Sequence, residues 1–160
     1  WAVEEGVTSG TTATTFSPYR GCTRGQVVTF LWRAAGCPEP ESSRNPFVDV
    51  PADSFCHDAV LWAAEEGITT GVTADRFQPN ATVTRGQVVT FLWRWEGSPT
   101  AQKTSGFRDV AASSFCAGAV AQGVPRGTPA TTFAPSQTCT RGQIVTFLYR
   151  DLFPAADYED

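Results

Sequence analysis

Apolar residues recur along this chain at the spacing of an amphipathic helix. In the clearest stretch, Val28, Leu31 and Trp32 form an i, i+3, i+4 stripe. The segment Thr23-Arg-Gly-Gln26 precedes the stripe. Thr-x-x-Gln is a capping box, in which the threonine hydroxyl accepts from the third helical N–H and the glutamine reaches back. The pattern predicts a helix that begins after Thr23 and ends near Gly36.

The same pattern occurs three times. Thr-Arg-Gly-Gln returns at Thr84 and Thr140, and the sequence from Trp62 repeats the sequence from Trp1 without a gap. The third copy has lost four residues equivalent to 61–64, and the first copy lacks its front half. We therefore divide the chain into a partial motif 1 (residues 1–46), a full motif 2 (47–106) and a shortened motif 3 (107–160).

Each full motif reads as two helices around a turn-rich loop. A front helix is expected to begin near Asp53 or Ser54 and to end at Gly67, which suits a left-handed terminator. A short extended piece is expected around Phe77, and the capped back helix follows. A two-helix motif cannot bury both of its faces alone, so the copies are expected to pack on one another. The expected fold is one mainly α domain over residues 1–160.

Composition narrows the function classes. The net charge of −4 argues against nonspecific nucleic-acid binding, and a single histidine leaves little room for a metal site or a catalytic triad. No apolar run approaches 18 residues, so no membrane-spanning helix is expected in this segment. The first residues do not resemble a signal peptide, so none is expected there. The cations are eleven arginines and one lysine, and arginine suits planar recognition of carboxylates.

The ordered blocks Phe47-Val-Asp-Val50, Gly67-Ile-Thr-Thr-Gly71, Phe77-Gln-Pro79 and Thr84-Arg85 resemble the S-layer homology motif. The resemblance covers about residues 1–153. It implies a pseudo-threefold, three-pronged helical domain with short extended segments, carried by secreted bacterial proteins of the cell wall or cell surface. It also implies a noncatalytic anchoring role without a cofactor. The implied partner is a secondary cell-wall polysaccharide that often carries a pyruvate ketal, held in the grooves of the domain.

The resemblance places the contact to the polysaccharide at the helix-start arginine, which by position is Arg24, Arg85 and Arg141. The chemistry agrees, because a guanidinium beside the free N–H groups of a helix start suits a carboxylate. Trp32 and Trp93 are candidate flat faces for sugar rings, and burial in the core is the alternative for both. The chain departs from the family in reading Thr-Arg-Gly-Gln where Thr-Arg-Ala-Glu is usual, which removes a carboxylate.

Several further features leave alternatives open. Asp49 and Asp109 are interpreted as turn or cap residues, with calcium binding as the minor alternative. Adjacent glutamates such as Glu65 and Glu66 point in different directions on a helix, so an enzyme is not expected.

The five cysteines permit one disulfide or none. Cys22 and Cys139 occupy one position of the repeat, and Cys56 and Cys116 occupy another. If these two positions touch within a motif, Cys116 meets Cys139. If they touch between consecutive motifs, Cys56 meets Cys22. The alternative is a set of small buried thiols.

A second functional interpretation starts from the missing front half of motif 1. Its absence is expected to expose apolar surface that includes some of Val27, Val28 and Phe30. Another chain would then complete the motif, so that the protein self-associates into a structural layer or filament.

Overall fold

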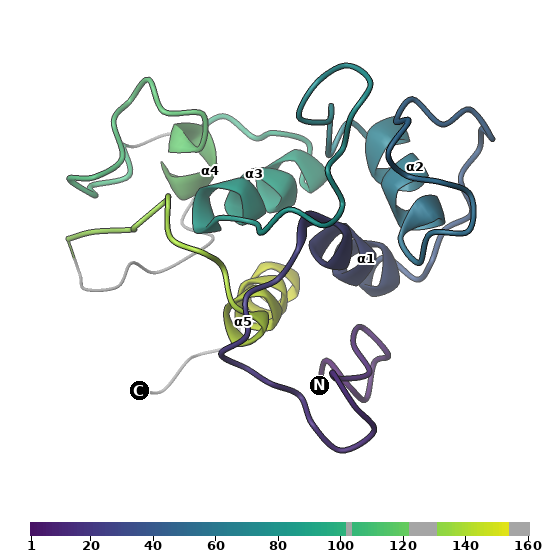
Figure 1. Cartoon of the computed structure of the whole chain (residues 1–160). Helices are drawn as coiled ribbons and strands as arrows, with labels where there is room; N and C mark the ends of the chain where they lie inside the picture. Colours follow the sequence, from purple (N-terminus) through teal and green to yellow (C-terminus); the bar gives the residue numbers. More distant parts are fainter. Residues whose placement is uncertain (102–103, 122–130, 154–160) are drawn as a thin grey trace.

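The computed structural model describes residues 1–101, 104–121 and 131–153, and this part of the chain is mainly α-helical without a sheet, as predicted (Figure 1). In chain order the helices are α1 (Arg24–Ala34), α2 (His57–Glu65), α3 (Arg85–Trp95), α4 (Ala117–Ala121) and α5 (Arg141–Leu152). The three back helices are α1, α3 and α5, and α2 and α4 belong to the front halves of motifs 2 and 3. Extended segments contact one another only through isolated bridges in the described residues.

The three predicted capping boxes are present at the starts of the back helices. The hydroxyls of Thr23, Thr84 and Thr140 each accept a hydrogen bond from the backbone N–H of the glutamine three residues later. Each glutamine side chain accepts in return from the N–H of its threonine, at 3.0–3.1 Å. Two N–H groups that the helix itself cannot satisfy are thereby paired at every back-helix start.

The front helix of motif 2 begins later than predicted. It starts at His57, and neither Asp53 nor Ser54 caps it. The preceding residues form tight turns, in which Ser54 N–H bonds to the Pro51 carbonyl and His57 N–H to the Ser54 carbonyl. The Ser54 hydroxyl contacts the Cys56 sulfur at 3.3 Å and so caps no helical N–H. The predicted end is confirmed, because Gly67 follows the helix with a φ of 69°.

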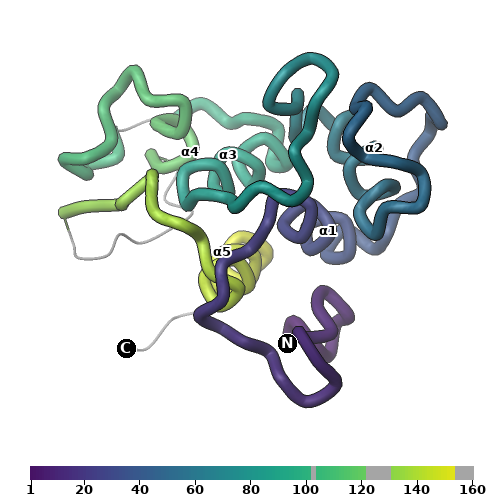
Figure 2. Tube along the Cα trace, in the orientation of Figure 1, coloured from purple at the N-terminus to yellow at the C-terminus, as the bar shows by residue number. Residues whose placement is uncertain are grey.

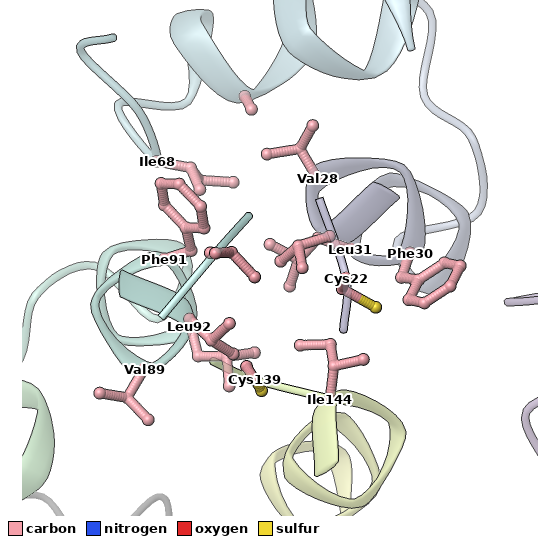
Figure 3. Close-up of a cluster of buried hydrophobic side chains, with 14 of the residues drawn as sticks. Cys22, Val28, Phe30, Leu31, Ile68, Val89, Phe91, Leu92, Cys139 and Ile144 are labelled. Atoms are coloured by element: carbon pink, nitrogen blue, oxygen red, sulfur yellow. The ribbon is translucent and has the colours of Figure 1, made fainter. Parts of the chain in front are cut away.

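A closed ring of backbone hydrogen bonds joins the three motifs at the centre of the molecule. Cys22 N–H donates to the Cys139 carbonyl at 3.0 Å, Cys139 N–H to the Val83 carbonyl at 2.9 Å, and Val83 N–H to the Cys22 carbonyl at 3.0 Å. In Figure 2 the segments that lead into the back helices converge on this region. Around it, the buried side chains of Leu31, Leu92 and Ile144 meet from α1, α3 and α5 (Figure 3). Each motif therefore contacts both of the others, in cyclic order.

Front halves pack against the back helix of the preceding motif. The α2 helix lies against α1, and α4 lies against α3, as Figure 1 shows. This arrangement overturns one expectation, because Val27, Val28 and Phe30 on α1 are all buried. The α2 helix of motif 2 covers one face of α1, and Arg141 of motif 3 lies 5.4 Å from the ring centroid of Phe30.

All five cysteines fall in the described residues and all are free thiols. Cys22 and Cys139 belong to the central ring, whereas Cys56 lies beside Gly25 of α1 and Cys116 beside Gly86 of α3. The two repeat positions are thus separate, and neither of the alternative disulfides is formed. Burial raises the pKa of Cys22 to about 11 and that of Cys139 to about 12, so both thiols are neutral at pH 7.

Candidate functional site

The arginines that follow the capping threonines are buried. Arg24, Arg85 and Arg141 expose 5%, 1% and 3% of their surface, although each begins a helix. We call them the first-turn arginines. Burial lowers the pKa of Arg24, the nearby Asp49 carboxylate opposes this effect, and a guanidinium stays charged in proteins.

Each first-turn arginine reaches into the loop of the next motif. The Nε atom of Arg24 donates to the Phe77 carbonyl at 2.8 Å, that of Arg85 to the Phe133 carbonyl at 3.0 Å, and that of Arg141 to the Phe16 carbonyl at 2.8 Å. Their guanidinium groups also lie 4.7–5.0 Å from the ring centroids of the same phenylalanines. A phenylalanine of the next back helix provides a second ring at 5.3–5.4 Å.

These contacts give the arginines a structural role. A cation at a helix N-terminus is unfavourable with the helix dipole. Here the carbonyl acceptor and two aromatic faces compensate, because buried cation–π contacts and charged hydrogen bonds are among the stronger polar interactions. The recurrence of arginine at this position is therefore explained by the way the motifs interlock, whether or not a ligand binds.

One of these arginines also lines an open groove. The groove has a volume of about 240 Å³. Arg24 borders it from motif 1, the loop from Thr69 to Val72 and α3 border it from motif 2, and Phe115 borders it from motif 3. Arg94, near the end of α3, is the second cation in the lining. We call this the Arg24 groove.

The lining of the Arg24 groove is well anchored. The Thr90 hydroxyl donates to the Gly86 carbonyl at 2.8 Å, and the Thr69 hydroxyl accepts from the Gly71 N–H at 3.1 Å. Arg94 Nη1 makes a long bond of 3.3 Å to the Ile68 carbonyl. Most polar groups of the walls are thus held in place, and the two guanidinium groups supply positive charge.

The other two first-turn arginines have different surroundings. Arg141 Nη2 donates to the Thr8 hydroxyl at 3.0 Å. Arg85 Nη2 is buried and has no hydrogen-bond partner among the residues that the structure describes. The repeat position that supplies Thr8 to Arg141 holds Pro125 in motif 3, which has no hydroxyl and lies outside the described residues. The three arginines are therefore equivalent in their Nε and ring contacts, while Arg141 and Arg85 differ in the surroundings of Nη2.

The two candidate tryptophans are half-buried and do not line the Arg24 groove. The Nε1 atom of Trp32 donates to the Pro38 carbonyl at 2.8 Å, and that of Trp93 to the Pro99 carbonyl at 2.9 Å. The ring of Trp93 also lies against the position of Gly118 in α4. Both side chains tie the end of a back helix to the connector that follows it.

Of the residues that line the Arg24 groove, only Arg24 was a predicted site residue, and two of the others, Arg94 and Phe115, have side chains suited to an acidic sugar. Arg94 recurs at the end of the back helices as Arg33 and Arg150, a position where a cation suits the negative end of the helix dipole. Phe115 repeats Phe55, and both are exposed, at 64% and 63%. The recurrence of phenylalanine at this repeat position could have marked Phe115 as a candidate site residue. Only the packing of α4 on α3 shows that Phe115 lies beside the groove of the preceding motif.

Three repeats, each with a capped back helix, close into a ring, and one arginine-lined groove lies between them. These features define a class of interlocked-repeat domain. The S-layer homology domain model matches residues 1–28 and 46–89. The chain belongs to the S-layer homology family, which implies cell-wall anchoring at the cell surface. Among the described residues, no helix is both long and apolar enough to cross a membrane.

Two relatives extend this assignment. The chain is 30% identical over 158 residues to a surface-layer 125 kDa protein of Lysinibacillus sphaericus, an alignment of 94% of this chain and 13% of that protein. It is 38% identical over 91 residues to an endoglucanase of Bacillus sp. strain KSM-635, covering 57% of this chain and 9% of the enzyme. The chain thus spans about a tenth of the length of these relatives.

Proposed function

We propose that this domain is a noncatalytic anchor that binds an acidic, pyruvate-bearing secondary cell-wall polysaccharide through the Arg24 groove. The observation that carries the proposal is the placement of Arg24, Arg94 and the exposed ring of Phe115 around one groove. The cyclic contacts among the motifs support a pseudo-threefold, three-pronged assembly as its frame. We propose that the protein is secreted and is located at the cell wall or cell surface of a bacterium.

The groove has the chemistry that an acidic sugar requires. Arginine recognises a carboxylate through charge-assisted, often bidentate hydrogen bonds, and the exposed face of Phe115 offers a surface for a sugar ring. A volume of about 240 Å³ lies below the roughly 300–1,000 Å³ of drug-sized sites. It suits one sugar residue with its acidic substituent, while the rest of the polymer stays outside.

The roles of the predicted site residues divide accordingly. Arg24 has its Nε committed to Phe77, so its ligand contact would come from the Nη atoms. Arg85 has a buried Nη2 that lacks an acceptor in the described part of the chain, which supports a second anion position there. Arg141, Trp32 and Trp93 have their polar groups engaged within the chain, and their contact with sugar stays a prediction.

The test is cosedimentation with purified acidic wall polysaccharide. Arg94→Gln removes the cation with the weaker internal contact, and we expect an affinity loss of about 10- to 150-fold, equivalent to one charged hydrogen bond of about 1.5–3 kcal/mol. Arg44→Gln, in an exposed connector, is the matched control and should bind like the parent. Replacing all three first-turn arginines would confuse binding with folding, because all three are buried.

Two further arms make the result decisive. Phe115→Ala should weaken binding, and polysaccharide whose carboxylates have been reduced should not bind. Circular dichroism and melting curves should match the parent for each variant. Full binding by both Arg94→Gln and Phe115→Ala would reject the Arg24 groove as the site.

A structural role in a self-assembling layer is the second candidate function. The observation in its favour is that α5, unlike α1 and α3, is not covered by a front-half helix in the described part of the chain. Concentration-dependent light scattering tests this role directly.

A further inference from the structure

The side-chain amide of Gln87 is engaged at its oxygen and free at its nitrogen. The Oε1 atom accepts a hydrogen bond of 3.0 Å from the Thr84 N–H, which is the return bond of the capping box of α3. This bond fixes the orientation of the amide, because only the carbonyl oxygen can accept from an N–H group. The Nε2 atom has no hydrogen-bond partner among the described residues and is not closed off from solvent.

Gln87 is part of the lining of the Arg24 groove. It precedes Thr90 and Phe91 by three and four positions and Arg94 by seven, so all four residues lie on one face of α3. The other three also line the groove. The free amide nitrogen of Gln87 and the guanidinium of Arg94 therefore border the same space.

Arg24 brings further free donors to this space. Its Nε is held by the Phe77 carbonyl at 2.8 Å, and the residue is 5% exposed. Neither Nη atom has a hydrogen-bond partner in the described part of the chain, and neither is closed off from solvent. Unpaired N–H groups on a buried guanidinium are costly, so an acceptor that enters the groove is favoured there.

The described lining of the groove contains two arginines and no acidic residue. The carboxylate that acts on the charge of Arg24 is that of Asp49, which opposes the lowering of the arginine pKa by burial. Asp49 lies outside the lining, and its oxygens accept from the N–H groups of Phe77 and Gln78 at 2.9 and 2.8 Å. The positive charge of the groove is thus not balanced by an acid within it.

The choice of glutamine at position 87 matters to the groove more than to the helix. A capping box forms with either glutamate or glutamine, and the helix dipole favours the negative charge of glutamate. Glutamate has only acceptor oxygens, so it would close the box with one oxygen and direct a negative acceptor at the groove with the other. Glutamine closes the same box and leaves two N–H donors for a ligand.

We propose that Gln87 is a specificity-determining residue of the Arg24 groove, which donates from Nε2 to an oxygen of the acidic substituent whose carboxylate Arg24 and Arg94 bind. This inference rests on the proposed function of the groove. A pyruvate ketal suits the donor set, because its carboxylate oxygens and its two ether oxygens are all acceptors. A neutral sugar unit would leave both guanidinium groups without an anion.

Gln87→Glu isolates this role. It keeps the return bond to the Thr84 N–H, so the melting temperature should not fall. It replaces a donor by a negative acceptor at the edge of the groove. The whole chain is titrated with the methyl glycoside of a hexose that carries a pyruvate ketal, and in parallel with the methyl ester of the same compound, which lacks the charge.

We expect Gln87→Glu to bind the acidic glycoside at least about tenfold more weakly than the parent, because a hydrogen bond to a charged group is lost and two carboxylates meet. The loss for the ester should be clearly smaller, since the repulsion between the carboxylates is absent. Gln137→Glu makes the same chemical change at an exposed position outside the lining and should bind both compounds like the parent.

A measurement on the parent makes the test independent of how the variant folds. The NMR signals of the Gln87 side-chain NH2 group should shift as the acidic glycoside is added and should saturate with the same dissociation constant as the Arg94 side-chain signals. The NH2 signals of Gln137 should stay in place.

Three results would overturn the role of Gln87 while leaving the function of the groove intact. The first is equal affinity of the parent and Gln87→Glu for the acidic glycoside. The second is an equal loss for the acid and the ester, which would assign the effect to structure and not to charge. The third is a Gln87 NH2 signal that does not move when the Arg94 signals are saturated.

A failure of the proposed function looks different. In that case the parent binds neither the acidic glycoside nor the wall polysaccharide, and the inference about Gln87 falls with it. Binding by the parent that is lost in Gln87→Glu, with the Gln87 NH2 signals shifted, supports both.

Discussion

The Nε atom of Arg24 donates a hydrogen bond of 2.8 Å to the carbonyl of Phe77, 53 residues further along the chain. The guanidinium carbon lies 4.7 Å from the centroid of the same phenylalanine ring. One side chain thus holds the loop of the next motif by its backbone and by its ring. Because this pair recurs twice in cyclic order, the arginines close the repeats into a single body.

Arg85→Lys tests this interlocking role. Lysine keeps the charge, but it lacks the planar fork that donates from Nε to the Phe133 carbonyl while stacking between two rings. We expect a loss of about 1–3 kcal/mol of unfolding free energy by urea denaturation. Arg44→Lys, which is exposed, serves as the control and should leave the curve unchanged. Equal stability of the two variants would show that the clamp contributes nothing.

Thr84→Ala removes one capping box. The threonine hydroxyl accepts from Gln87 N–H at 3.3 Å, and no other side chain in the described residues takes its place. The expected destabilisation is roughly 0.5–2 kcal/mol, read from the thermal or urea midpoint. Thr100→Ala, in the exposed connector after α3, is the matched control. A melting curve that does not move for Thr84→Ala contradicts the assigned cap.

Gly71→Ala and Gly67→Ala separate backbone conformation from close packing. Both glycines have positive φ, at 82° and 69°. An added Cβ at Gly67 meets nothing within 4 Å, so its cost should be roughly the 1–2 kcal/mol of a left-handed alanine. At Gly71 it would lie 2.5 Å from both the Phe47 ring and the Thr73 carbonyl, so we expect about 3 kcal/mol or more. Similar costs for the two variants would contradict the tight fit at Gly71.

Asp151 predicts a pH dependence of stability. Burial, together with the neighbouring Glu96 carboxylate, raises the pKa of Asp151 from 3.8 to about 7. Below pH 3.8 both the folded and unfolded chains hold the proton. Between pH 4 and 7 only the folded chain keeps it, so the unfolding free energy contributed by this residue falls as the pH rises. Above pH 7 the loss is complete.

Asp151→Asn should abolish that slope, because the amide does not titrate. Urea unfolding at pH 4.5, 6 and 8 measures it. Glu96→Gln provides a second variant, and it should reduce the slope by removing the neighbouring carboxylate. A parent protein whose stability is constant across this range, with Asp151→Asn behaving identically, would contradict the raised pKa.

Local signals in the sequence predicted local structure well. The Thr-x-x-Gln boxes at Thr23, Thr84 and Thr140 specify back-helix starts, because donor and acceptor lie within four residues of each other. Gly67 ends α2 for a similarly local reason, since only glycine enters the left-handed region without cost. The start of α2 was predicted wrongly, because tight turns engage the residues around Ser54 before the helix begins.

By itself, the sequence determined the repeats, the helical class of the protein and its family, since these depend on residue type and spacing. Tertiary structure decided which motif covers which. Val28 is buried because α2 of the next motif lies on α1, a pairing that no local pattern specifies. The same long-range packing buries Arg24 against Phe77 and brings Phe115 to the groove beside it. These contacts join residues tens of positions apart, so they follow from how the motifs close into a ring and not from the pattern within any one motif.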